Sequence, residues 1–232
     1  MHDSDRRRFI AGGLAAAAVA PVAMTGLSGR AAAAIQSVPL GTTRFRIERS
    51  GATIGEHVAE ITRRDGFIHA RNRIDISVGA LGLVLFRYAH ASDELRDSDG
   101  IIRIDARTDD DGETTRLSAR RDGRLVSVDA PDATRRVPAD ILTTGLWHPD
   151  TPRAPRLLNL SDGDLVIIQP NGPRREMVDL PGIGLTPARA YRLNDPLHRT
   201  VWYDDANRLI AVNFISGEDG SHIRARATDL PT

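Results

Sequence analysis

The chain has 232 residues, and its 31 basic side chains balance 31 acidic ones, so its formal charge at pH 7 is zero. This balance disfavours nucleic-acid binding, which needs a basic surface. Cysteine and lysine are both absent, which excludes disulfides, thiolate metal sites and a Schiff-base lysine. We therefore expect no cofactor, no metal site and no nucleic-acid partner.

Residues 1–34 have the pattern of a twin-arginine (Tat) signal peptide. Residues 6–10 (RRRFI) supply the paired arginines, and residues 32–34 (AAA) offer a cleavage site. The apolar run over residues 10–23 is too short for a membrane-spanning helix, although an uncleaved anchor is the alternative. We expect export of the folded chain by the twin-arginine translocase, to the periplasm or the extracellular space.

Residues 35–232 predict a single all-β domain. Turn signals such as Ser50-Gly51, Asp65-Gly66 and Asn171-Gly172 separate runs of strand length. Asp-Gly and Asn-Gly pairs supply the positive φ angles of tight hairpin turns, so the pattern indicates an antiparallel meander. No run keeps a 3.6-residue apolar period, so we expect few helices and a strongly curved sheet that forms a barrel or half-barrel.

The Asp65-Gly66 turn predicts the register of the hairpin around it. If these two residues form the loop, Ile61 lies opposite Ala70 and His57 lies opposite Ile74. One face then collects apolar side chains: Ala59, Ile61, Ile68, Ala70, Ile74, Ile76 and Val78. The last hairpins show the same alternation, with an apolar face of Leu197, Val201, Ile210, Val212, Phe214, Ile223 and Ala225.

A sheet with one apolar face needs a cover, and residues 131–161 are the natural candidate. This long segment contains five prolines, so we expect an irregular covering loop. It is either a lid over a ligand or a plug that completes the core. In the lid interpretation, the ligand-binding residues are Trp147, His148, Leu142, Leu146 and Leu157, together with His57 on the apolar face. For His57, a hydrogen-bonded core histidine is the alternative.

A second candidate group is polar. Tyr88, His90 and Glu94 lie at even-numbered positions of one predicted strand, so their side chains share a face. The Asp99-Gly100 turn that follows predicts Arg107 opposite His90 and Arg103 opposite Glu94. A shared face of these five residues would suit an anionic headgroup. Cross-strand ion pairs on a solvated face explain them equally well.

No catalytic residue is assigned. The sequence has no G-x-S-x-G elbow, no H-E-x-x-H motif, no Walker loop and no G-x-G-x-x-G after a strand. The sequence therefore favours a protein that is not an enzyme, with a hydrolase or isomerase of unrecognised site as the remaining alternative.

Several short motifs occur along the chain in a fixed order: Ile54-Gly55-x-His57, Tyr88 and Glu94 before a turn, Thr108 before Gly112, Leu146-Trp147, and Val201-Trp202-Tyr203-Asp204 leading into Arg208-Leu209-Ile210. This order resembles exported bacterial families known only as domains of unknown function. The resemblance implies a strongly curved antiparallel sheet, distantly similar to periplasmic lipoprotein and lipid carriers. It implies no activity.

Together these observations predict an exported, non-enzymatic binding protein for an apolar or amphipathic small molecule or lipid. The alternative is a structural or protein-interaction module of the cell envelope with a filled barrel. Internal volume distinguishes the two, because a carrier needs a cavity of roughly 300 Å³ or more. The sequence indicates neither the ligand nor the oligomeric state.

The leader generates a direct test. Replacing Arg6 and Arg7 by lysine removes the residues that the translocase reads, so we expect unprocessed protein to accumulate in the cytoplasm. Immunoblotting of cytoplasmic and periplasmic fractions measures this outcome. Normal appearance of the processed form in the periplasm would contradict the assignment of the leader.

Overall fold

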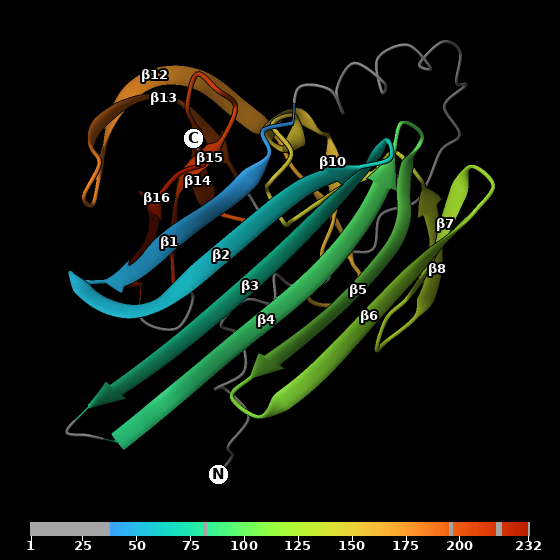
Figure 1. The fold of residues 1–232 in the computed structure, drawn as a ribbon. Coiled ribbons are helices and arrows are strands. Elements are labelled where there is room, and N and C mark those ends of the chain that lie inside the picture. The colour runs from blue at the N-terminus through green and yellow to red at the C-terminus, as the bar shows by residue number, and fades with distance from the viewer. Residues whose placement is uncertain (1–37, 81–82, 195–196, 217–219, 232) are drawn as a thin grey trace.

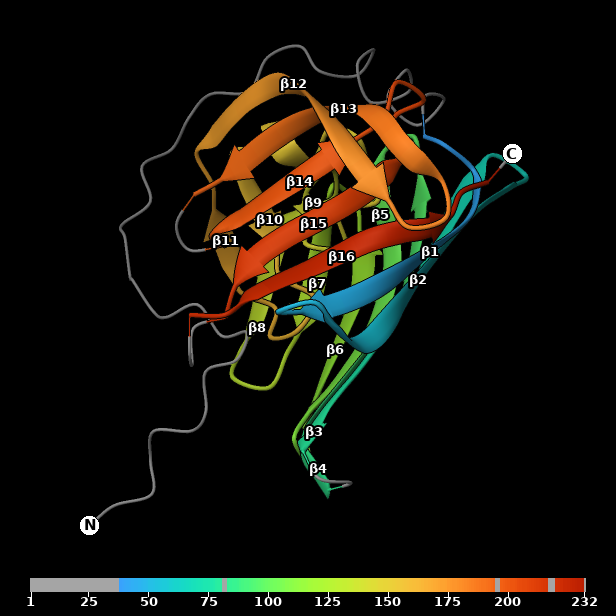
Figure 2. The same cartoon turned by 90° about the vertical axis from the view of Figure 1, so that its left-hand side faces the viewer.

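A computed structural model describes residues 38–80, 83–194, 197–216 and 220–231, so the predicted leader lies outside the described part of the chain. One large antiparallel sheet curls over a smaller sheet of three short strands (Figures 1 and 2). Within the described residues, no helix is long and apolar enough to cross a membrane. The prediction of an all-β, barrel-like fold is confirmed.

The large sheet has thirteen strands, and every neighbouring pair in it is antiparallel. Strands β12 and β8 are its two edges, so the sheet is curled rather than closed. In spatial order the strands are β12 (Pro170–Leu180), β13 (Gly184–Leu193), β14 (Arg199–Tyr203), β15 (Leu209–Ile215), β16 (His222–Asp229), β1 (Gly41–Arg49), β2 (Ala52–Arg64), β3 (Phe67–Ala80), β4 (Leu83–Asp97), β5 (Gly100–Asp110), β6 (Glu113–Asp122), β7 (Leu125–Asp129) and β8 (Thr134–Pro138).

The predicted register of the β2–β3 hairpin is confirmed. Ile61 pairs with Ala70 and His57 with Ile74, around a turn in which Asp65 and Gly66 both have positive φ angles, 51° and 81°. These angles match the twist of the flanking strands, which is why the turn determines the register. The apolar positions of both strands face inward and the charged positions face solvent.

The predicted register of the β4–β5 hairpin is wrong by one residue. His90 pairs with Thr108 rather than with Arg107. A β-bulge opposite Leu95 and Arg96 adds one residue, Ile102, to β5 near the turn. Because side chains alternate between faces, one extra residue moves every more distant partner to the opposite face.

This shift separates the five residues that were predicted to share a polar face. Tyr88, His90 and Glu94 are buried on the inner side of the sheet, whereas Arg103 and Arg107 are exposed on the outer side. The predicted anionic-headgroup surface made of all five side chains is therefore wrong.

The covering segment, residues 131–161, is more regular than predicted. It contains β8, β9 (Leu142–Thr143), the short 3-10 helix η1 (Thr151–Arg153) and β10 (Arg156–Leu158). β10 pairs with β9 and with β11 (Leu165–Ile167) to form the small sheet. Two of its five prolines, Pro138 and Pro152, occupy the edge strand β8 and the first turn of η1, where a backbone N–H is not needed. The other three lie in bends and turns.

The small sheet and its connections fill the concave side of the large sheet. Leu146 and Leu157 pack in the largest apolar cluster, beneath β13–β16 and β1. Leu158 and Leu160 pack against β5–β7, and Trp147 packs against Ile61 and its neighbours on β2 and β3. Residues 142–160 thus contribute to each of the three apolar clusters of the core.

The confirmed register predicts unequal effects on the two faces of one hairpin. Ile61→Asp places a carboxylate among buried hydrocarbon, so we expect it to lower the free energy of unfolding by about 3 kcal/mol or more. Arg71→Ala removes only exposed ion pairs with Glu60 and Asp93 and should cost less than about 1 kcal/mol. Urea unfolding measures both. Equal losses would contradict the register.

Candidate functional site

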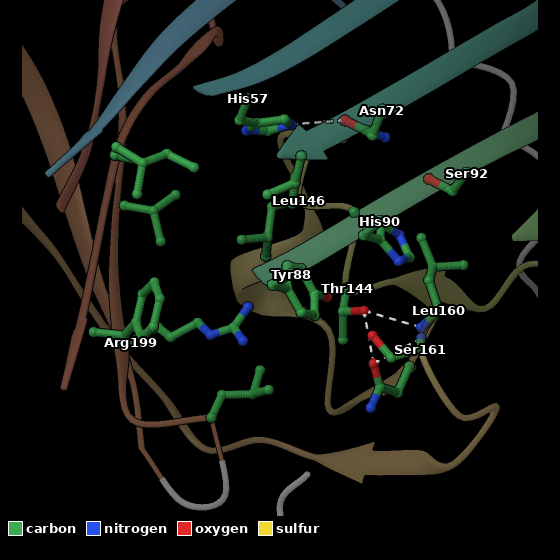
Figure 3. A pocket seen from close by; sticks show the side chains of 18 of the residues that line it. His57, Asn72, Tyr88, His90, Ser92, Thr144, Leu146, Leu160, Ser161 and Arg199 are labelled. Atoms are coloured by element: carbon green, nitrogen blue, oxygen red, sulfur yellow. Dashed lines mark hydrogen bonds between the residues drawn. The ribbon is translucent and has the colours of Figure 1, made fainter. Parts of the chain in front are cut away.

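A cavity of about 130 Å³ lies between the concave face of the large sheet and two stretches of the covering segment, Thr144–Leu146 and Asn159–Ser161 (Figure 3). β1, β3, β15 and β16 line it with apolar side chains, and a smaller number of polar side chains point into the same space. The apolar walls include Ile47, Ile74, Ile76, Val212 and Phe214. Apolar walls with a few polar groups are the usual composition of a small-molecule site.

Two histidines on β2 and β4 border the cavity, and both are neutral. The His57 ring stacks on Phe45, and its Nε2–H donates a hydrogen bond of 3.2 Å to Oδ1 of Asn72. His90 Nδ1 lies 2.9 Å from Oγ1 of Thr108. Burial lowers the pKa of each histidine to about 4, and the proximity of His57 lowers that of His90 further. Neither ring therefore carries a charge at neutral pH.

Two lining residues have buried polar atoms without a partner. Nδ2 of Asn72 and Oγ of Ser92 make no hydrogen bond with any described residue, although both side chains are buried. Buried polar groups are nearly always hydrogen-bonded, so an exception needs an explanation. A bound molecule or a water in the cavity would provide the missing partner.

Arg199, the first residue of β14, points into the cavity towards Tyr88 (Figure 3). Its guanidinium carbon lies 5.3 Å from the centre of the Phe214 ring. Within the described chain its side chain makes no hydrogen bond or ion pair. Burial lowers its pKa, but a guanidinium stays protonated at neutral pH. Because both histidines are neutral, Arg199 is the one charged side chain among the described lining residues.

Tyr88 faces Arg199 from β4. Its hydroxyl group is hydrogen-bonded to Ser161, and burial raises its pKa, so the phenol is neutral and can donate a hydrogen bond. Asp162 is close enough to influence Tyr88, but its Oδ2 accepts a hydrogen bond from Asn159 at 2.8 Å and it does not line the cavity. The Tyr88 end of the cavity is therefore free of lining carboxylates.

Glu94 anchors the wall that the covering segment contributes. Its carboxylate is fully buried and accepts hydrogen bonds from Nε1 of Trp147 (2.9 Å), Oγ1 of Thr143 (2.9 Å) and Nη1 of Arg96 (3.5 Å). Arg96 donates a further bond of 2.6 Å to the carbonyl of Ile141. Burial raises the pKa of Glu94, and the charge of Arg96 with these donors opposes that rise. The segment is thereby fixed to β4 on both sides of β9.

Leu146 forms part of the cavity wall in a strained conformation. Its φ is +60°, which is uncommon for a residue other than glycine. The buried Tyr203 hydroxyl donates a hydrogen bond of 2.6 Å to the Leu146 carbonyl and holds it in place. Such strain persists only where the surroundings determine the conformation, and it clusters at functional sites.

The structure divides the six residues predicted to bind a ligand. Leu146 and His57 line the cavity. The other four pack in the core beside it: Trp147, His148, Leu142 and Leu157. The Trp147 side chain is directed towards Glu94, and the two leucines belong to strands of the small sheet. Burial also lowers the pKa of His148 to about 4, and its Nδ1 accepts the backbone N–H of Asp150.

Sequence reasoning missed six polar lining residues: Arg199, Asn72 and Ser92 on the large sheet, and Thr144, Asn159 and Ser161 in the covering segment. The three on the large sheet occupy positions that alternate with apolar or buried residues on an inward face, and this alternation was the available signal. Among the described residues, no group of three or more histidine, aspartate or glutamate side chains could hold a metal ion.

Comparison with known proteins identifies a family but no activity. Residues 45–228 match the family described as Domain of unknown function (DUF6134). A solved structure, the beta-barrel-like protein of Domain of Unknown Function DUF1849 from Brucella abortus, is similar over 84% of this chain and 100% of that chain, with 12% identity and a TM-score of 0.60. No curated protein matches the chain. At this identity the solved structure supports the fold alone.

The two tryptophans offer a matched test of the Glu94 anchor. Trp147 and Trp202 each donate Nε1–H to a glutamate, at 2.9 Å and 2.8 Å, but the first pair is buried and the second exposed. Trp147→Phe leaves Glu94 short of a donor and should lower the free energy of unfolding by about 1–3 kcal/mol. Trp202→Phe, the control, should cost less than about 1 kcal/mol. Equal small losses in urea unfolding would favour a loosely held lid.

Proposed function

The chain belongs to the DUF6134 family, and we propose that it is an exported, non-enzymatic protein that binds a small amphipathic molecule between its curled sheet and its covering segment. The observation that carries this proposal is a cavity with apolar walls, lined by the unpaired Arg199 and by Asn72 and Ser92, each of which has a buried polar atom without a hydrogen-bond partner. Unpaired polar groups in an apolar cavity disfavour a purely structural role, because they lower stability without a ligand.

The volume restricts the size of the ligand. At about 130 Å³ the cavity is smaller than the roughly 300 Å³ expected of a lipid carrier. It is close to the volume of about 150 Å³ that accommodates a benzene ring. A single ring or a short acyl chain therefore fits, and a complete lipid does not.

An apolar surface continues from the cavity along β3 and β4. β3 and β4 extend past the neighbouring strands as a two-stranded arm (Figures 1 and 2). Its cross-strand pair Ile76–Tyr88 lines the cavity, and the next inward-facing pair, Val78–Phe86, continues the apolar surface towards the exposed Leu83. This surface supports an amphipathic ligand whose apolar end points along the arm.

The proposed location is the periplasm or the extracellular space. The paired arginines, the short apolar run and the alanines of residues 1–34 support export by the twin-arginine translocase. A distant functional similarity to periplasmic lipid carriers belongs to the same proposal, restricted by the cavity volume to ligands smaller than a lipid.

A structural or protein-interaction module remains the second candidate. The small volume favours it, as does the packing of residues 142–160 against all three core clusters. In this interpretation, the covering segment is a plug and the cavity holds water.

Ligand binding separates the two candidates. We expect phenol, hexanol, benzoate or hexanoate to raise the melting temperature in a saturable manner, since a ligand at 100 times its Kd adds about 2.7 kcal/mol of stability. Ala225→Phe fills the cavity and should abolish the shift, whereas Ala91→Phe on the exposed outer face should not. Native mass spectrometry of protein from its own periplasm would reveal a co-purified molecule. If no probe binds and nothing co-purifies, the structural role is correct.

A further inference from the structure

We propose that the cavity selects a small monocarboxylate, whose carboxylate pairs with Arg199 and whose ring or short acyl chain occupies the apolar space. This inference rests on the proposed function of the cavity and adds the charge of its ligand. The ring and the acyl chain are two sources of the same chemistry, an anionic head on a compact apolar body.

The lack of a partner for Arg199 is the first argument. Two other partly buried arginines have carboxylate partners: Arg121 pairs with Asp97 and Arg208 with Asp204, each at 2.7 Å. Arg199 lines a largely apolar cavity, yet none of the described carboxylates pairs with it. Charges inside proteins are normally paired, because an isolated charge in an apolar environment is costly. A ligand carboxylate would supply the missing partner.

The charge of the surroundings is the second argument. His57 and His90 are neutral, and no described carboxylate lines the cavity, so Arg199 is the one charged lining group that an entering anion meets. Asp110 and Asp162 influence Tyr88 from outside the lining. Tyr88 faces Arg199 as a neutral hydroxyl donor (Figure 3). A guanidinium binds both oxygens of a carboxylate side by side, and the phenol can donate to a remaining lone pair.

The unpaired donors on the β3–β4 wall are the third argument. Nδ2 of Asn72 is a donor without an acceptor, and Oγ of Ser92 has no partner of either kind. With Arg199 and Tyr88, these groups make the polar content of the cavity rich in donors. Oxygen acceptors on a ligand complement such a lining, whereas an amine does not.

Calorimetric titration of the full protein tests the charge preference with two pairs of isosteres, benzoate against benzamide and hexanoate against hexanamide. We expect each acid to bind wild-type protein at least about tenfold more tightly than its amide, because a charge-assisted hydrogen bond is stronger than a neutral one. The stronger of the two acids shows whether the site prefers a ring or an acyl chain.

Arg199→Met should lower the affinity for the acids by about 10- to 100-fold and change that for the amides by less than about threefold. Arg224→Met, on the exposed outer face of β16, is the matched control and should leave every affinity unchanged. Arg199 has no hydrogen-bonding or ionic partner without ligand, and methionine can also pack against Phe214, so we expect the ligand-free Arg199→Met protein to melt no lower than wild type. If that variant does not fold, Arg199→Gln serves in the same titrations.

The outcomes distinguish this inference from the function on which it rests. Equal affinities for acids and amides in wild type, or an unchanged acid affinity in both Arg199 variants, would overturn the carboxylate preference while the binding function stands. If neither acids nor amides bind, the binding function fails, and the carboxylate proposal fails with it.

Discussion

The buried carboxylate of Glu94 determines where the covering segment lies. A carboxylate inside an apolar core is tolerated only when hydrogen bonds and an opposite charge compensate its lost hydration. Thr143, Trp147 and Arg96 provide these partners, and two of the three come from the covering segment. The segment therefore cannot leave the concave face without breaking two of the three hydrogen bonds that compensate the buried carboxylate.

The cavity follows from the same constraint. Gly145 lies between the two Glu94 ligands of the segment, and a Cβ at this position would approach Oε1 of Glu94 to 3.0 Å. The chain passes Glu94 closely here and then turns at Leu146 with a positive φ, held by Tyr203. Thr144, Gly145 and Leu146 thereby form one wall opposite Arg199 and the two neutral histidines. The hydrogen bonds of Glu94 to Thr143 and Trp147 thus hold the adjacent cavity wall in place.

Local turn chemistry accounts for what the sequence could predict of the fold. Asp65-Gly66 specifies a two-residue loop, and the β2–β3 strands keep a regular ladder from Arg64–Phe67 to Gly55–Ile76, so the register could be derived residue by residue. β4–β5 has an equally clear turn, but the bulge at Leu95/Arg96 changes the register. A bulge depends on how both strands pack and twist, and the residue types at this position do not predict it. The small sheet was missed for a related reason, since its strands are two or three residues long.

The candidate site shows a different limit. Trp147 was expected at the ligand because a large aromatic in a proline-rich segment suits a lid, but its indole N–H bonds to Glu94 and its ring faces the core. Conversely, Arg199 was not predicted as a site residue, although it lies between Leu197 and Val201 on a face that is otherwise apolar. A packed core would exclude a guanidinium from such a position. In a curled sheet, a polar residue that interrupts inward-facing alternation therefore indicates space and a partner on the concave side, whereas a conspicuous aromatic often completes the packing.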